Sequence, residues 1–348
     1  MNRAKHIFPE FYNEFRCIAS DCPDSCCKDW DVVVDDEASE FYSSLEGEFG
    51  SRLKSKMTID NDGDRIFISD GGKCPFWNQN HLCDIYIKLG EEHLCGTCKE
   101  FPRITQDYTV FVEHMLSFAC PEAARIMLRE NCRFEMAENL TVGGDNIGYD
   151  ADMMNFLLAA RKKSCDLLRD RRFSFKNGLK RCLAFNEFVQ YLIYKECFDI
   201  PKLSKYNFQY SIMPQKDRSF IFELHSNLDI MNKNWLLDLC ASSESVLSDS
   251  KEIDYEFVNM ALYYIFRYYL GAIDSFNAVN TVKRIVCAYV VISSMIAHNA
   301  AEHNFDRRVL LMQQYSKEVE HSYENSELLE ERFMNDPNFS ADELLRIL

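Results

Sequence analysis

Nine of the fifteen cysteines in this 348-residue chain lie between residues 17 and 120, and they constrain the fold more than any other feature. Their spacing is Cys17-x4-Cys22-x3-Cys26-Cys27, then Cys74-x8-Cys83-x11-Cys95-x2-Cys98, then Cys120. Two thiolates separated by two residues can reach one metal from a single turn, and a second closely spaced group can complete the shell. The region is therefore predicted to be a metal site with all nine cysteines as candidate ligands.

The metal itself stays open between an iron-sulfur cluster and zinc, because a shell of four thiolates suits both. Histidine is scarce here, with His81, His93 and His114 alone in the region, so a thiolate-only shell is expected. Neighbouring side chains diverge along a helix or strand, so Cys26 and Cys27 are not expected to point the same way. Nine thiols could accordingly serve one centre or two.

Charge and composition exclude several other classes of protein. The formal charge of -16 opposes sequence-independent binding to nucleic acid or to anionic lipid. The amino terminus lacks a signal peptide, and an odd number of cysteines argues against a disulfide framework, so a cytoplasmic protein with reduced thiols is expected. The longest apolar stretch, 286–297, is too short to cross a bilayer and predicts a buried helix.

The chain changes character near residue 150, since ten of its twelve glycines and five of its eight prolines lie at or before Gly148. The predicted fold class is α+β: a small cysteine-rich mixed domain at 1–150 with a metal site, then a mostly α-helical bundle at 151–348. In the first domain we expect strands at 30–35 and 108–112, a helix over 37–53 and another beginning at Pro121. In the second, apolar residues at steps of three or four predict helices. These are expected near 151–172, 179–198, 218–240, 255–273, 278–300 and 305–322, with a capping box of Ser340 and Glu343 before a last helix.

Several sequence blocks carry a family resemblance. The run from Cys17 to Asp35 (CIASDCPDSCCKDWDVVVD) resembles the amino-terminal signature of the flagellin lysine N-methylase family. Later blocks of that family are matched in order by Cys74-Pro-Phe, LCDIY at 82–86, LGEEHLCGTC at 89–98, FPR at 101–103 and ACPEAA at 119–124. The resemblance is specific over residues 11–125 and weak beyond. The same pattern is similar, more distantly, to small bacterial cysteine-cluster proteins that chelate zinc or iron.

The resemblance implies transfer of a methyl group from S-adenosylmethionine to lysine side chains of flagellin, with an iron-sulfur centre of the 4Fe-4S type, or zinc, as the metal. Trp30, Tyr86 and Arg103 are the non-cysteine motif residues predicted to shape the methyl-donor pocket, and ordinary packing is the alternative role. Asp29 replaces the glycine expected before Trp30. The competing hypothesis is a non-catalytic zinc- or iron-binding protein with a redox or interaction role.

Methylation needs a neutral lysine amine, so a base or a desolvating pocket is expected. Four carboxylates lie near the cysteines in sequence: Asp21, Asp24, Asp35 and Glu113. Each is as readily explained as a solvated surface group, so the sequence assigns none of them as the base.

Overall fold

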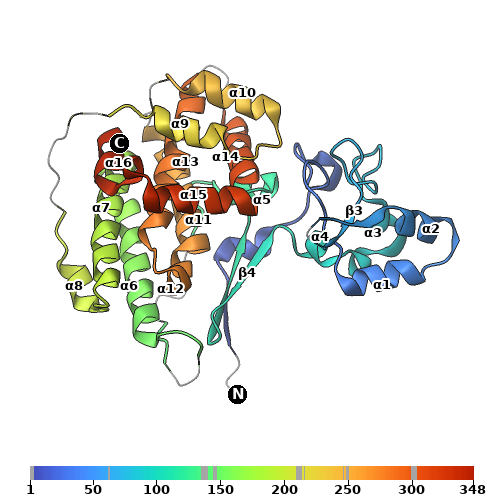
Figure 1. Cartoon of the computed structure of the whole chain (residues 1–348), viewed down its shortest axis with the longest axis horizontal. Coiled ribbons are helices and arrows are strands. Elements are labelled where there is room, and N and C mark those ends of the chain that lie inside the picture. Colours follow the sequence, from blue (N-terminus) through green and yellow to red (C-terminus); the bar gives the residue numbers. More distant parts are fainter. Residues whose placement is uncertain are drawn as a thin grey trace. The chain divides into compact units, whose positions relative to one another are not determined.

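The chain forms two compact units in a computed structural model that describes residues 4–61, 63–134, 140–143, 147–208, 214, 216–245, 247, 251–298 and 304–348. One unit contains residues 15–104 and 116–123 and is called the cysteine unit. The other contains 1–14, 105–115 and 124–348 and is called the helical unit. Figure 1 shows short helices and strands in the first unit and long helices in the second. The expectation of a mixed α+β chain with a helical carboxyl-terminal region is confirmed.

These units divide differently from the domain boundary predicted at residue 150. Strand β1 (Lys5–Ile7) pairs in parallel with β5 (Phe111–Leu116), and β4 (Arg103–Asp107) lies on the other side of β5. This three-stranded sheet belongs mostly to the helical unit, because the buried Glu113 of β5 forms an ion pair with Arg161 of α6 (Ala151–Leu168). The division into two units therefore depends on contacts between segments far apart in sequence, and composition does not reveal such contacts.

In the cysteine unit the short elements surround one small hydrophobic core. They are α1 (Asp36–Ser44), α2 (Gly47–Ser55), the antiparallel pair β2 (Met57–Ile59) and β3 (Arg65–Phe67), α3 (Asp84–Leu89) and α4 (Gly96–Glu100). Tyr42, Leu53 and Phe76 are fully buried in this core. The single helix predicted at 37–53 is instead two helices, because Leu45 and Glu46 are extended and Gly47 has a φ of +82°.

The predicted strand at 30–35 was wrong, and the one at 108–112 was displaced. Residues 30–35 form only an isolated bridge between Val33 and Ile66, with hydrogen bonds from the Val34 N–H to the Arg65 carbonyl and from the Phe67 N–H to the Val32 carbonyl. The second strand begins at Phe111, because Tyr108–Val110 form a tight turn in which Thr109 has a φ of 66°. The helix predicted at Pro121 is confirmed as α5 (Pro121–Met127).

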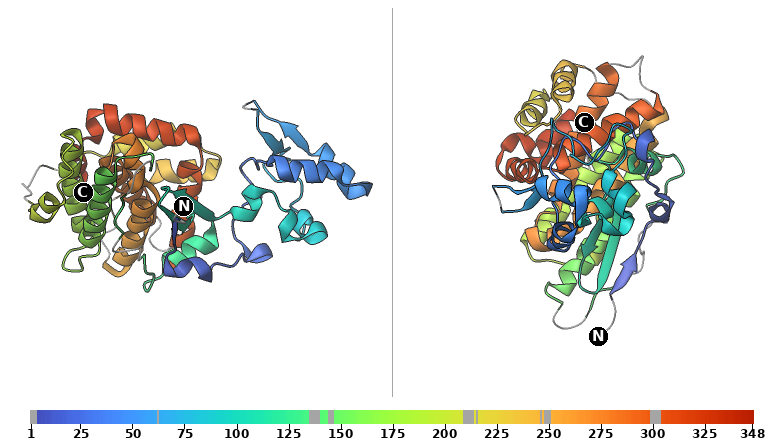
Figure 2. Two further views of the ribbon diagram at one scale, coloured as in Figure 1. Left: turned by 90° about the horizontal axis from the view of Figure 1, so that it is seen from below. Right: turned by 90° about the vertical axis from the view of Figure 1, so that its right-hand side faces the viewer.

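Long helices pack around a central apolar helix in the helical unit (Figures 1 and 2). Helix α13 (Val279–His298) contacts its neighbours α7, α10, α11 and α14, and α6 packs against α7 and α11. By length and composition α13 could cross a membrane, but its apolar window is 100% buried in this unit, so the predicted buried helix is confirmed. The other helices are α7 (Phe175–Tyr194), α8 (Ile200–Lys205), α9 (Ser219–Ser226), α10 (Lys233–Ser242), α11 (Asp254–Tyr268), α12 (Ala272–Ser275), α14 (Phe305–Glu320), α15 (Tyr323–Asn335) and α16 (Ala341–Ile347). Short 3-10 turns occur at Glu10–Glu14, Ala19–Asp21, Glu91–His93, Lys251–Ile253, Tyr269–Gly271 and Pro337–Phe339.

Side-chain caps explain where several of these helices begin. Asp150 and Ser174 accept backbone N–H bonds in the first turns of α6 and α7. The one helix predicted over 218–240 is interrupted, because Asn232 caps a new helix, α10, after the end of α9. The predicted capping box at the last helix is only half present: Ser340 precedes α16, but its side chain makes no capping hydrogen bond.

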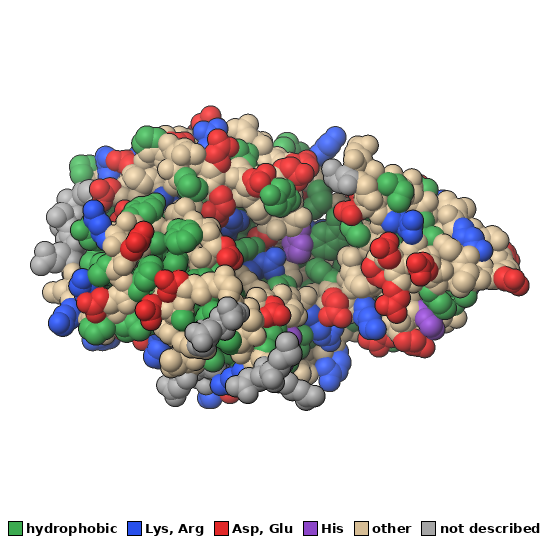
Figure 3. Space-filling view, turned by 60° about the horizontal axis from the view of Figure 1, so that its bottom comes forward, with side chains coloured by type: hydrophobic (Ala, Val, Ile, Leu, Met, Phe, Trp, Pro, Cys, Tyr) green, Lys and Arg blue, Asp and Glu red, His purple; other side chains and the backbone are tan. Residues whose placement is uncertain are grey.

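Acidic and basic side chains are interspersed on the face of the molecule shown in Figure 3. The net charge of -16 is therefore not gathered into a single patch on that face.

Candidate metal centre

Four of the predicted ligands lie against the same core of the cysteine unit. Cys95 is buried in that core, and the half-buried Cys74, Cys83 and Cys98 pack against it. The Cys-Gly-Thr-Cys turn opens α4, which places Cys95 and Cys98 one turn apart. These two thiols share a hydrogen bond, which lowers the pKa of Cys95 and raises that of Cys98.

Backbone hydrogen bonds bring the amino-terminal cysteines to this core. Cys74 donates its N–H to the Cys27 carbonyl at 2.8 Å, so the end of the first run of cysteines lies beside the start of the second. Asp35 caps α1 through the Ala38 N–H at 2.9 Å and accepts the Gly96 N–H at 2.6 Å. These two bonds hold the pKa of Asp35 below its usual value and fasten the segment after Cys27 to the Cys95–Cys98 turn.

Mutual electrostatic effects join five thiols, which we call the first thiol group: Cys27, Cys74, Cys83, Cys95 and Cys98. Burial is the main cause that raises the pKa of Cys74 to about 12, and the nearby thiols of Cys27, Cys83 and Cys95 contribute to that rise. The pKa of Cys83 is raised by burial and by Cys27. Binding a metal cation would favour the thiolates that burial disfavours.

The other four thiols form the second thiol group: Cys17, Cys22, Cys26 and Cys120. Burial raises the pKa of Cys120 to about 12, with further contributions from Cys22 and Cys17. A hydrogen bond with Cys27 is the main cause of the raised pKa of Cys26, and burial and then Cys27, Cys120 and Cys17 add to it. Cys26 and Cys27 therefore lie at the junction of the two groups.

Neither group has the geometry of a finished metal site. Within the described ranges, no group of three or more His, Cys, Asp or Glu side chains is arranged to hold a metal ion. The thiols are near enough to perturb one another electrostatically, but they do not converge as ligands do. Their chemistry nevertheless fits a thiolate centre, because each group offers at least four sulfur donors.

Nearby histidines and carboxylates have other partners. His93 stacks on Phe41 and His81 on Trp77, while His114 belongs to the helical unit. Asp24 forms an ion pair with Lys28 at 2.9 Å, and Glu113 forms the buried pair with Arg161. Together with the capping role of Asp35, these contacts give three of the four candidate carboxylates a structural explanation.

The residues predicted to shape the methyl-donor pocket come from three different segments. Trp30 donates its indole N–H to the Cys26 carbonyl at 2.7 Å and meets Phe101 edge to face, so it lies beside the cysteines. Tyr86 of α3 is 52% exposed. The Arg103 guanidinium lies over the Phe15 ring at 5.5 Å. Their role toward a methyl donor stays a prediction.

The six later cysteines lie in the helical unit. Cys165, Cys182 and Cys287 are buried, and burial raises the pKa of each, as expected for cysteines that pack as small apolar side chains.

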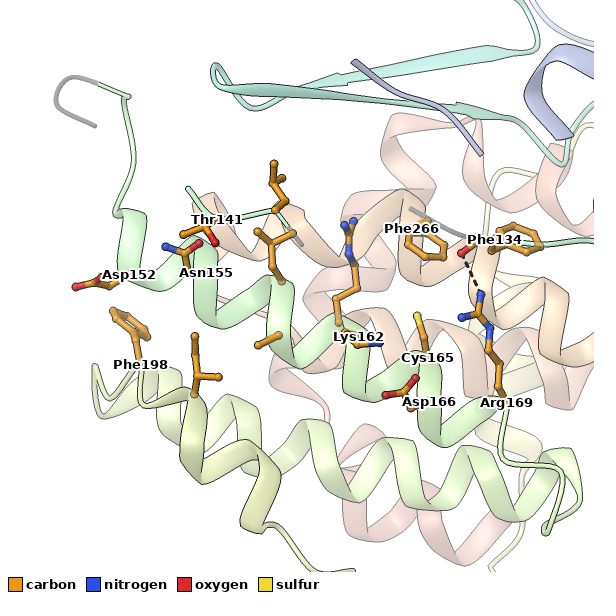
Figure 4. A pocket seen from close by; sticks show the side chains of 15 residues that line it. Phe134, Thr141, Asp152, Asn155, Lys162, Cys165, Asp166, Arg169, Phe198 and Phe266 are labelled. Atoms are coloured by element: carbon orange, nitrogen blue, oxygen red, sulfur yellow. Dashed lines mark hydrogen bonds between the residues drawn. The ribbon is translucent and has the colours of Figure 1, made fainter. Parts of the chain in front are cut away.

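Sequence reasoning missed a cavity of 440 Å³ in the helical unit, shown in Figure 4. One face of α6 lines it with residues at helical spacing, among them Asp152, Asn155, Lys162 and Asp166. Phe198 lies near the Asp152 end, and Phe134 and Phe266 lie near the other, where Arg169 donates to the Phe134 carbonyl at 3.0 Å. The recurring polar residues on an otherwise apolar helix were the available signal.

The model of the FliB lysine N-methylase C-terminal domain matches residues 241–347. The flagellar biosynthetic protein FliU of Salmonella muenchen is 31% identical over 134 residues, which are 35% of this chain and 76% of that protein. The chain belongs to the flagellin lysine N-methylase family. No solved structure matches it.

Lysine-N-methylases of this family are also similar to the chain, but only over part of their length. The protein of that name from Salmonella typhimurium is 29% identical over 146 residues, 38% of this chain and 35% of the relative. A second, from Salmonella choleraesuis, matches to the same extent. The chain therefore aligns with about a third of the length of these relatives.

The match to the lysine N-methylase family at 241–347 corrects the expectation that the resemblance is weak beyond residue 125. That region holds a buried polar cluster, in which the Glu320 carboxylate accepts hydrogen bonds from the hydroxyls of Tyr263, Tyr264 and Tyr268 at 2.7–2.9 Å. The Arg267 Nε lies 3.4 Å from the same carboxylate. The sequence predicted a helix over 255–273 but no role for these three tyrosines, because the carboxylate that accepts from their hydroxyls comes from another helix.

Proposed function

We propose that this protein is a lysine N-methyltransferase that transfers a methyl group from S-adenosylmethionine to lysine side chains of flagellin. Membership of the flagellin lysine N-methylase family is the observation that carries the proposal. The relative from Salmonella typhimurium is named lysine-N-methylase, and the relative from Salmonella muenchen is named a flagellar biosynthetic protein.

The proposed reaction is a displacement at carbon. The neutral lysine ε-amine attacks the methyl carbon of the donor, the bond from that carbon to the sulfonium breaks, and S-adenosylhomocysteine leaves. The new N–C bond forms as the amine releases one proton. Since free lysine is protonated at neutral pH, the enzyme must first lower the pKa of its substrate amine by desolvation or accept its proton.

We further propose that the cysteine unit holds an iron-sulfur centre, with zinc as the alternative. The first thiol group supplies five candidate ligands and the second supplies four, so two four-thiolate centres are possible as well as one. A bound centre would fix the segments that carry the thiols relative to one another, because metal binding and folding are coupled in such sites. Trp30, which contacts the Cys26 carbonyl, would then be held beside it.

Methyl transfer can be tested with the full chain purified without oxygen, flagellin and donor labelled in its methyl group. Label is expected in lysines of flagellin. A protein with full metal content that neither transfers label nor binds the donor in calorimetry would refute the methyltransferase proposal and favour the non-catalytic metal-binding alternative.

Metal binding is tested separately by iron, sulfide and zinc assays on cysteine variants. Cys98→Ser in the first group and Cys120→Ser in the second are each expected to lower the metal content. Cys197→Ser in the helical unit is a matched control and is expected to leave it unchanged. A loss in only one of the first two variants would indicate one centre, and no loss in either would refute the metal proposal.

A further inference from the structure

Two histidines face each other on neighbouring strands of the helical unit, and one of them, His114, falls within the cysteine-rich region of the sequence but not within the cysteine unit. His6 of β1 pairs with Val112 of β5, and His114 lies two residues farther along β5 on the same face of the sheet. The His6 Nδ1 atom lies 2.8 Å from the His114 Nε2 atom. The two rings are close to coplanar, with an angle of 18° between their planes and 5.1 Å between centroids.

The surroundings hold the His114 ring in one orientation. Phe8 stacks on it with 4.2 Å between centroids and only 5° between the planes, and Tyr12 meets it edge to face at 5.8 Å. The His114 Nδ1 atom lies 3.2 Å from the Thr105 hydroxyl. If Nδ1–H donates to this hydroxyl, Nε2 directs its lone pair toward His6, which is how metal-bound histidines are commonly oriented.

The distance between the facing nitrogens is close to that of a chelating pair. Metal–nitrogen bonds of about 2.0–2.1 Å at angles between octahedral and tetrahedral place two nitrogens about 2.9–3.4 Å apart. The rings meet edge to edge, because 5.1 Å between centroids with 2.8 Å between the facing nitrogens places the two lone pairs in line with each other. The exposed His6 ring must therefore rotate, moving its Nδ1 by roughly 2 Å, before both nitrogens meet on one ion. The proton on the His6 Nδ1 would move to its Nε2 by exchange with solvent, so both ligands stay neutral imidazoles.

We propose that His6 and His114 form a binding site for a divalent transition metal ion of the zinc, nickel or copper type. Imidazole nitrogen is a preferred ligand of these ions. The described part of the chain offers no group of three or more ligands, so water completes the shell. The ion links β1 to β5 across a strand of only three residues, and the site is separate from the thiols of the cysteine unit.

Hydrogen exchange tests the site at the strand it would link. Nickel chloride is added to the full chain after its thiol sites have been loaded, and amide exchange is followed at Lys5–Ile7 and Phe111–Leu116. The Lys5 N–H, which donates to the Val110 carbonyl at 3.1 Å, reports directly on the attachment of β1. At free nickel about one hundred times the Kd, exchange through opening of β1 is expected to slow by roughly a hundredfold.

Matched variants separate this site from nickel bound elsewhere. His6→Gln, at an exposed position, is expected to abolish the slowing, measured against the exchange of the same variant without nickel. His81→Gln, in the cysteine unit, is expected to keep it. Equal slowing in His6→Gln, or no slowing of the unmodified chain at millimolar nickel, would overturn the proposal.

Discussion

The ion pair between Glu113 and Arg161 offers a sharp test of how strongly strand β5 is held to helix α6 within the helical unit. Two hydrogen bonds of 2.6 and 2.7 Å join the carboxylate of β5 to the guanidinium of α6. The side chains are 1% and 6% exposed, and the guanidinium lies 5.1 Å from the centroid of the Phe266 ring. Glu113→Gln therefore leaves a buried positive charge without its counter-ion.

The expected loss follows from that geometry. Breaking a buried pair by removing one partner costs about 3–5 kcal/mol, mostly from the charge left behind. For a unit of roughly 150–250 residues, each kcal/mol lowers the Tm by about 2–4 °C, so a fall of roughly 6–20 °C is expected. Arg161→Met should cost a similar amount, and the double variant Glu113→Gln/Arg161→Met should cost less than the sum of the two.

Thermal unfolding followed by far-ultraviolet circular dichroism is a suitable assay, because the long helices of the helical unit dominate that signal. Glu331→Gln on the exposed side of α15 is the matched control, with an expected change within about 0.5 kcal/mol. Additive losses in the double variant, or a Tm for Glu113→Gln equal to that of the control, would refute the reasoning.

Three further predictions concern other polar contacts. Burial lowers the pKa of His225 to about 4, below the value of about 6.5 in the unfolded chain. As the pH falls, the unfolded state therefore binds the proton first, and the free energy of unfolding should fall by about 3 kcal/mol between pH 6.5 and 4. In urea unfolding, His225→Gln should flatten that dependence, and an unchanged slope would contradict it. Asp35→Ala removes the cap of α1 and the hydrogen bond from the Gly96 N–H, and it should lower the free energy of unfolding by about 1–2 kcal/mol. The metal content should also fall, and full metal retention would oppose the proposed link to the Cys95–Cys98 turn. Glu320→Gln weakens the three hydrogen bonds from the tyrosine hydroxyls and should lower the free energy of unfolding by roughly 3 kcal/mol. The near-ultraviolet circular dichroism of the tyrosines should change, and an unaltered spectrum would count against the buried cluster.

Much of the helical unit could be predicted because apolar residues at helical spacing report a buried face directly. The segment at 286–297 was correctly expected to be a buried helix, and Pro121 correctly marked a helix start. Interruptions of a helix were harder to predict. The end of α9 and the cap at Asn232 depend on a few local hydrogen bonds, while the apolar pattern of the sequence continues across them. Residues 30–35 look like a strand in sequence, but their pairing with β3 is limited to one bridge at Val33.

The candidate site was predicted in its residues but not in its arrangement. Spacing singled out the nine cysteines, while the contact that joins Cys27 to Cys74 within the first thiol group forms across 46 intervening residues and only in the folded chain. The cavity along α6 was missed, because its walls come from segments whose proximity no local pattern encodes.

By itself the sequence determined three things: the nine clustered cysteines as candidate ligands, a family signature, and a helical region with few breaks. Tertiary structure decided which groups meet. In the tertiary structure β1 joins the helical unit by pairing with β5, His6 lies against His114, and the Glu113 carboxylate is buried against the Arg161 guanidinium. The physical reason is that residue type and spacing fix local propensity and ligand chemistry, whereas burial, pairing and charge neutralisation depend on segments distant in the chain.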